Sequence, residues 1–165
     1  MEWTASTSLR YRRVNSRDVP SMKQLLHIIC HHCRSVNRVP VARLSDRPHC
    51  GQCHMPLFTG RPIPLTAADF DLHASRSDIP LVVDFWASWC GPCQVMAPAY
   101  QQAAEFLEPE VRLAKVDTEE ERSLASRFGI GNIPTLIVLR EGGELARQSG
   151  VMGTQDIVRW VKSYV

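Results

Sequence analysis

The strongest hydrophobic signal in the chain is the apolar run Leu81–Trp86, which only Asp84 interrupts. Its β-branched content and its length predict a buried strand of a mostly parallel sheet. A helix is expected directly after it, because Pro92 suits a first helical position and no helix breaker follows before Pro98. Cys90 therefore lies at the predicted start of that helix.

The pattern around this central unit predicts further alternating helices and strands. Thr66, at an N-cap position, opens a short helix, and a Glu-Gly-Gly-Glu turn joins the last two strands in a hairpin. The order, α-β-α-β-α-β-β-α, predicts an α/β domain in which helices cover both faces of a mixed sheet. Besides the central strand and its helix, the expected elements are helices at 66–72, 118–128 and 154–164 and strands at 110–117, 133–139 and 145–149.

Two Cys-x-x-Cys pairs, Cys30/Cys33 and Cys50/Cys53, precede this domain, with sixteen residues between them. Such spacing is typical of zinc sites, in which each pair forms a knuckle and two knuckles supply four thiolates to one tetrahedral Zn²⁺. A segment of this size has little apolar material for a core, so metal binding is expected to provide roughly 10 kcal/mol or more of its folding free energy. We therefore predict a zinc-ribbon module over residues 22–60 that unfolds without zinc.

Several histidines near these cysteines are alternative ligands. Four cysteines in matched pairs already complete a tetrahedral shell, so we interpret the histidines as surface residues or as hydrogen-bond partners of the ligands. Zinc is structural in this interpretation, and a redox-sensing zinc, released when its thiolates are oxidised, is a second hypothesis. The histidines concerned are His27, His31, His32, His49 and His54.

The third pair, Cys90/Cys93, differs because it follows a predicted strand and opens a predicted helix. Unpaired N–H groups and the positive end of the helix dipole favour a negative charge there, so the Cys90 thiol is expected to ionise readily. Cys93, one turn further on, can then attack a mixed disulfide formed at Cys90. Such a pair can also be half of a zinc site, but the strand–turn–helix context favours redox chemistry.

Composition restricts the possible partners and compartments. The net charge is +2, with charged residues distributed along the chain, and gives no electrostatic signature of binding to nucleic acid or to an anionic membrane. No apolar run approaches the roughly 20 residues of a membrane span. All six cysteines occur in Cys-x-x-Cys pairs, a use typical of reducing compartments, so we expect a cytoplasmic protein.

Residues 1–21 lack these patterns. They contain four arginines, many Ser and Thr residues and no apolar segment suited to a secretory signal. We interpret them as a disordered extension or, if Met22 is the initiator, as an artefact of start-site choice. A transit peptide is a third alternative, which Glu2 and Asp18 disfavour. A Gly- and Pro-rich stretch at 59–64 marks the next junction, so residues 61–165 are the second domain.

The second domain resembles the thioredoxin family, whose active-site motif is present unchanged as Trp89-Cys90-Gly91-Pro92-Cys93. With the four-cysteine module in front, residues 22–165 are similar to the zinc-ribbon-bearing second class of bacterial thioredoxins. The resemblance implies a thioredoxin fold, a central mixed sheet flanked by helices, with an N-terminal zinc ribbon. The other residues that match the family by position are Asp84, Trp86, Pro98, Lys115 and Ile133-Pro134-Thr135.

The resemblance implies a protein-disulfide reductase with Cys90 as nucleophile and Cys93 as resolving thiol. Asp84, desolvated in an apolar strand, is expected to hold its proton to unusually high pH and to accept a proton from Cys93, while Lys115 modulates that proton affinity. A buried structural carboxylate and a solvent-facing lysine are the simpler alternatives for these two residues. The implied docking surface for client proteins comprises Trp89, Gly91, Pro92, Ile133, Gly150 and Pro134, the last after a cis peptide bond.

The family resemblance also implies the partners. They are disulfide-containing client proteins and an NADPH-dependent thioredoxin reductase as electron donor. The chain itself has no flavin or nicotinamide motif, so we expect it to bind neither cofactor. We also expect a monomer. One alternative is an oxidant or isomerase on the same fold, which Gly91-Pro92 disfavours because it resembles the reducing members. Another is a zinc-dependent binding module or chaperone that uses the domain only as a platform.

Overall fold

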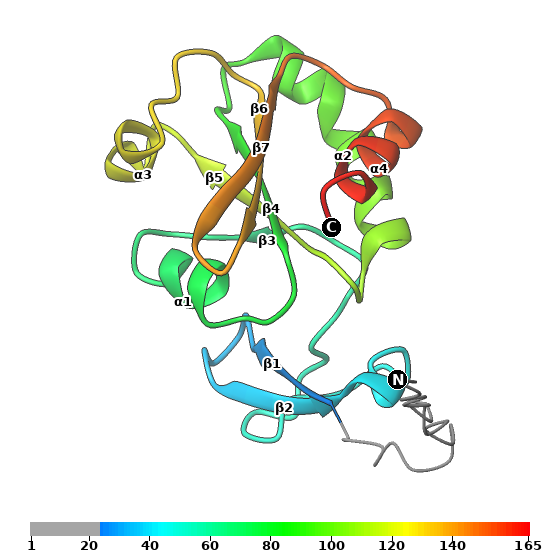
Figure 1. Cartoon of the computed structure of the whole chain (residues 1–165). Coiled ribbons are helices and arrows are strands. Elements are labelled where there is room, and N and C mark those ends of the chain that lie inside the picture. Colours follow the sequence, from blue (N-terminus) through cyan, green and yellow to red (C-terminus); the bar gives the residue numbers. More distant parts are fainter. Residues whose placement is uncertain (1–23) are drawn as a thin grey trace, which may run out of the picture.

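The computed structural model describes residues 24–165, which form a small two-stranded module and a larger α/β domain beside it (Figure 1). The interpretation of residues 1–21 lies outside the described residues. No helix in the described part is long and apolar enough to cross a membrane.

The module is built from two hairpins that bring four cysteines together. Strands β1 (Leu25–Ile29) and β2 (Val36–Pro40) pair antiparallel, and a short 3-10 turn, η1 (Val41–Arg43), follows. Cys30 and Cys33 lie in the β1–β2 turn, and Cys50 and Cys53 lie in the second hairpin, which a bridge between His49 and Pro56 closes. A small apolar core lies between the hairpins and includes Ile28, Val39, Leu44 and Leu57.

The larger domain has a five-stranded mixed sheet in the order β3-β5-β4-β6-β7. Its central strand β4 (Leu81–Trp86) coincides with the apolar run, and it pairs parallel with β5 (Arg112–Asp117) and antiparallel with β6 (Thr135–Arg140). Strand β7 (Gly143–Ser149) pairs back on β6. The predicted hairpin turn is confirmed: Glu141 and Gly142 have φ angles of 51° and 78°, which match the left-handed positions of a two-residue turn.

Alternate residues of β4 face opposite sides of the sheet. Val82 packs in a cluster with α2 (Gly91–Leu107) and α4 (Thr154–Lys162), whereas Val83 packs in a second cluster with α1 (Phe70–Ser75) and α3 (Arg122–Arg127). Figure 1 shows the two pairs of helices on either side of the sheet. Because Asp84 is two residues after Val82, it faces α2, the helix that Cys90 opens.

Some predicted boundaries were wrong, and local interactions explain why. Helix α1 begins at Phe70 and not at Thr66, because the Asp69 carboxylate accepts hydrogen bonds from the Thr66 N–H at 2.7 Å and its hydroxyl at 3.1 Å, which closes a turn. Helix α3 also starts later than predicted, at Arg122 and not at Thr118. Helix α2 continues through Pro98 to Leu107.

The Gly- and Pro-rich junction also contains an element that the pattern did not predict. Residues Ile63 and Pro64 form β3, a short parallel edge strand beside Ala114 and Lys115 of β5. A proline is tolerated there because an edge strand leaves one side unpaired. The order from residue 61 is therefore β-α-β-α-β-α-β-β-α.

The module is attached to the larger domain through β1. The His27 N–H donates to the Asp78 carboxylate at 2.6 Å, and the His27 carbonyl accepts from the Asp78 N–H at 2.9 Å. Ile79 from the larger domain completes the module's core. The hydrogen bonds and the apolar packing that join the two parts therefore lie at adjacent residues of the larger domain, Asp78 and Ile79.

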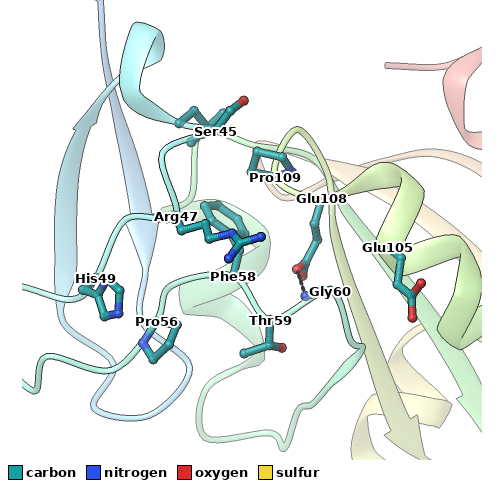
Figure 2. Close-up of a pocket in the computed structure, with 11 residues that line it drawn as sticks. Ser45, Arg47, His49, Pro56, Phe58, Thr59, Gly60, Glu105, Glu108 and Pro109 are labelled. Atoms are coloured by element: carbon teal, nitrogen blue, oxygen red, sulfur yellow. Dashed lines mark hydrogen bonds between the residues drawn. The ribbon is translucent and has the colours of Figure 1, made fainter.

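A cavity of about 720 Å³ opens at the junction of the two parts, between Arg47 and His49 of the module and Glu105 and Glu108 at the end of α2 (Figure 2). Beside this cavity, Glu108 accepts from the Gly60 N–H at 2.8 Å and pairs with Arg112 at 3.3 Å.

Candidate functional site

Cys90 and Cys93 form a disulfide at the N-terminus of α2. Cys90 is the N-cap residue with an extended backbone, and Pro92 lies in the first turn, as expected for a helix start. The Cys93 N–H points at the Cys90 sulfur, 3.2 Å away. In the reduced protein the same N–H would stabilise a Cys90 thiolate, together with the helix dipole.

The surface beside Cys90 is apolar and open. Trp89 is 68% exposed, Gly91 and Pro92 are exposed, and Val151, after Gly150, is 50% exposed. The Trp89 indole N–H donates to Glu119 at 3.3 Å, which fixes one edge of the ring. Val151 and Glu119 are not among the site residues predicted from the sequence. In the sequence, Glu119 cannot be distinguished from its acidic neighbours Glu120 and Glu121, because only the fold places it beside Trp89.

The loop before β6 lies directly against the disulfide. The Ile133–Pro134 peptide bond is cis, as expected, and the Ile133 carbonyl lies 3.8 Å from the Cys90 sulfur. Within the described residues, the Ile133 N–H donates to no other group. Gly150, with a φ angle of 97° that favours glycine, donates its N–H to the Pro134 carbonyl at 2.9 Å. The structure thus brings Ile133, Pro134 and Gly150 to the cysteine pair.

Asp84 is fully buried, and neither of its carboxylate oxygens has a hydrogen-bond partner in the described part of the chain. Burial therefore raises the pKa of Asp84 from 3.8 to about 7, although Lys115 acts in the opposite direction. Lys115 is its register partner on β5, and the Lys115 ammonium lies 4.4 Å from the centre of the Trp86 ring. Asp84 and Lys115 are therefore neighbours in the sheet.

The other four cysteines form one cluster, with all sulfur atoms within 4.8 Å of one another. The Cys30–Cys53 and Cys33–Cys50 sulfur pairs are each 3.6 Å apart. A tetrahedral ZnS₄ site with Zn–S bonds of about 2.3 Å has sulfur atoms roughly 3.8 Å apart, so the four thiols fit zinc.

Polar groups around the cluster support it. The Cys50 sulfur contacts the Ser35 hydroxyl at 3.0 Å, the Asn37 amide at 3.6 Å and the Gln52 N–H at 3.4 Å. Such contacts orient metal-bound thiolates and stabilise their negative charge.

The histidines near the cluster contribute no ring nitrogen to it among the described residues. Four of the five are exposed, in agreement with their interpretation as surface residues, and His31 is half-buried. The buried histidine of the larger domain, His73, was missed. Its Nε2 has no partner within the described residues, and burial, with Arg112 acting in the same direction, lowers its pKa to about 4.

Comparisons with known proteins divide the chain in a similar way. The thioredoxin family profile matches residues 61–163, and the profile of the N-terminal domain of thioredoxin 2 matches residues 29–55. Thioredoxin C-3 from Corynebacterium nephridii is 42% identical over 134 residues, which cover 81% of this chain and 92% of that protein. Thioredoxin from Haemophilus influenzae is 32% identical over 98 residues, 59% of this chain and 92% of that protein.

A solved structure resembles the larger domain. It is that of a single-site mutant of thioredoxin from Halobacterium salinarum NRC-1, which superposes with a TM-score of 0.59 at 29% sequence identity. The match covers 65% of this chain and 93% of that chain.

Proposed function

The chain belongs to the thioredoxin family and is a protein-disulfide reductase, and we propose that Cys90 is its nucleophile and Cys93 its resolving thiol. The observation that supports this order is the Cys93 N–H directed at the Cys90 sulfur at the helix N-terminus. That environment favours the thiolate at Cys90 over the thiolate at Cys93.

In the first step of the proposed reaction, the Cys90 thiolate attacks one sulfur of a client disulfide. A mixed disulfide forms, the client S–S bond breaks, and the other client sulfur leaves as a thiolate. The exposed Trp89, Gly91 and Pro92 supply an apolar docking surface. The Ile133 N–H, which has no partner among residues 24–165, is available to pair with an extended client backbone.

In the second step Cys93 attacks the Cys90 sulfur and releases the client. Cys93 must lose its proton, and we assign the acceptor role to Asp84, whose raised pKa of about 7 leaves it ready to take up a proton near neutral pH. Lys115, its neighbour on β5, tunes this affinity. The client gains two electrons and two protons, and the Cys90–Cys93 disulfide of the structure is the product state.

An external donor must then reduce the Cys90–Cys93 disulfide. We propose an NADPH-dependent thioredoxin reductase for this step, as is general in the family. We further propose a cytoplasmic monomer, with residues 22–60 and 61–165 as its two domains.

A trapping experiment tests the two cysteine roles. Cys93→Ser is expected to accumulate client proteins as mixed disulfides on Cys90, because resolution is blocked. Cys90→Ser is expected to trap none and to lose insulin reduction. Non-reducing gels and mass spectrometry of the captured adducts provide the measurement. Equal trapping by both variants, or full insulin turnover by Cys90→Ser, contradicts the assignment.

We also propose that Cys30, Cys33, Cys50 and Cys53 bind one structural Zn²⁺, which is supported by the zinc-ribbon family match and by the sulfur cluster. When bound, the metal crosslinks the two hairpins through four thiolates. Both its binding and the fold of the module then depend on all four ligands.

Metal analysis tests this proposal. The purified full chain is expected to contain one zinc per chain, and Cys50→Ser is expected to lose it together with the hydrogen-exchange protection of the β1–β2 amides. The matched control is the double variant Cys90→Ser/Cys93→Ser, which should retain zinc. If Cys50→Ser retains a full equivalent of zinc, the four-cysteine shell is wrong.

A further inference from the structure

Strand β2 has an open outer edge. The Cys30 N–H donates to the Ser35 carbonyl, and the Val41 N–H donates to the Gln24 carbonyl. These two bonds identify the hydrogen-bonded pairs of the β1–β2 ladder. By the alternation of an antiparallel ladder, the backbone N–H and C=O groups of Val36 and Arg38 point away from β1. These groups have no partner within residues 24–165.

The equivalent edge of β1 is already occupied. The backbone of His27, the register partner of Arg38, is bonded to Asp78 of the larger domain. Figure 1 shows β2 on the outer side of the module, away from the sheet of the larger domain. Within the described residues, the middle of β1 is thus bonded to the larger domain, whereas the outer edge of β2 is open to an added strand.

A groove of about 400 Å³ runs along β2. All five residues of β2 line it, and Arg43, Pro48 and His49 form part of the opposite wall. Val36 and, just beyond the groove, Val41 are each 45% exposed, so apolar surface is available beside the open edge. The groove has the position and shape that an added extended segment requires.

The charged residues that line the groove are Arg38, Arg43 and Asp46, and the module around them is more basic than the chain's overall charge of +2 indicates. Residues 24–60 contain four arginines and one acidic residue, Asp46, whereas residues 61–165 contain ten basic and fourteen acidic residues. Asp46 is already 3.5 Å from Arg43, and Arg34 is paired with Asp69 of the larger domain. Arg38, in the middle of the open edge, has no ion-pair partner in the described part of the chain. The charges are thus separated between the two parts and are not evenly mixed.

We propose that this edge binds an extended, acidic segment of a partner protein, which adds as a third strand to β2. The added strand forms up to four backbone hydrogen bonds with Val36 and Arg38, and its acidic side chains lie beside Arg38, whose guanidinium has no ion-pair partner within residues 24–165. The addition ends at Pro40, which has no N–H. This interaction is separate from disulfide exchange, because the groove lies on the module and not beside Cys90.

A single-stranded nucleic acid fits this groove less well than an acidic peptide does. Single-stranded nucleic acids are held by aromatic side chains that stack on the bases, together with basic residues. The residues that line the groove include no Phe, Tyr or Trp. The free backbone groups instead match the hydrogen-bonding pattern of a peptide strand.

Amide chemical shifts of the zinc-loaded full chain test the proposal. The probe is a capped peptide of about eight residues that alternates Glu and Thr, and the same peptide with Lys in place of Glu is its counterpart. The Glu peptide is expected to shift the amides of Val36 and Arg38, and its affinity should fall at least tenfold in about 0.5 M salt. The Lys peptide should produce no shifts.

Two variants separate charge from backbone pairing. Arg38→Glu should lower the affinity for the Glu peptide at least tenfold. Arg140→Glu, at an exposed site in the larger domain, should change this affinity less than twofold. Val36→Pro removes an outward-facing N–H and breaks no hydrogen bond of the β1–β2 ladder. It should weaken peptide binding, and zinc content is measured in the same sample to check that the cysteine cluster is intact.

Three outcomes overturn the proposal. The first is equal binding of the Lys peptide, and the second is unchanged binding in both Arg38→Glu and Val36→Pro. The third is an occupant of another kind at this edge: tighter binding of a single-stranded oligonucleotide, or amide shifts that depend on protein concentration alone and so indicate a second copy of the chain.

Discussion

Replacing Asp84 with Asn is expected to make the oxidised protein more stable than wild type. The difference in the free energy of unfolding should grow to about 4 kcal/mol between about pH 3 and pH 8. The native pKa of about 7 exceeds the unfolded value of 3.8, so between these values the native state binds more protons than the unfolded state. The contribution of Asp84 to wild-type stability therefore falls as pH rises through this range, then levels off above it. Asn cannot ionise and removes this loss.

Urea denaturation of both proteins at several pH values provides the measurement. Only their difference is interpreted, because other groups titrate in both proteins. Glu110→Gln, at an exposed carboxylate, is the matched control and should follow wild type at each pH. A difference between Asp84→Asn and wild type that does not change with pH would falsify the assignment of a raised pKa to Asp84.

The same variant should slow release of client proteins. Without a buried base, Cys93 must lose its proton to solvent, so the mixed disulfide on Cys90 is expected to persist longer at neutral pH. The slowing should diminish at higher pH, where the Cys93 thiol ionises without help. Rapid-quench measurement of the mixed disulfide separates this effect from a change in stability. An unchanged lifetime at neutral pH assigns Asp84 a structural role only.

Replacing Arg112 with Met is expected to destabilise the protein by about 3–5 kcal/mol, because it leaves the Glu108 carboxylate buried without its partner. Both side chains are only 3% exposed, and the Arg112 guanidinium lies 4.6 Å from the centre of the Phe58 ring. Burial raises the pKa of Glu108, while Arg112 and the Gly60 N–H lower it. In the variant this carboxyl should protonate more easily, so the destabilisation should shrink as the pH falls.

A second substitution distinguishes the unpaired charge from a packing defect. Adding Glu108→Gln to Arg112→Met keeps an acceptor for the Gly60 N–H and removes the charge, so it should recover most of the lost stability. The control is Arg147→Met, which breaks a half-exposed pair with Glu144 and should cost at most about 1 kcal/mol. A loss below about 1 kcal/mol in Arg112→Met, measured on the zinc-loaded chain, is the result that contradicts this account.

The parts of the structure that local sequence determines were predictable. Strand β4 matches its apolar run residue for residue, because a buried strand needs continuous apolar side chains. The dithiol and the four-cysteine cluster were found because Cys-x-x-Cys spacing and its context encode them directly. The resemblance to a family supplied the cis bond before Pro134, which spacing alone does not indicate.

The features that were missed depend on contacts between distant segments. Helix α1 starts late because Asp69 bonds Thr66 in a turn, a competition that the capping pattern does not reveal. The pairing of Glu108 and Arg112 resembles an ordinary surface i,i+4 pair until Phe58 and Gly60 cover it. The open edge of β2 is visible only in the fold, where β1 is the strand bonded to Asp78 and β2 is the outer strand.

Ile79 belongs to the chain of the larger domain but packs in the core of the module, two residues before β4 begins. A protein cut at residue 60 would therefore expose an apolar side chain at the base of the strand that carries Asp84, and would also uncover the guanidinium of Arg112. The division visible in the sequence is thus not a division in packing. Transplanting either part into another protein requires redesign of the surface left behind.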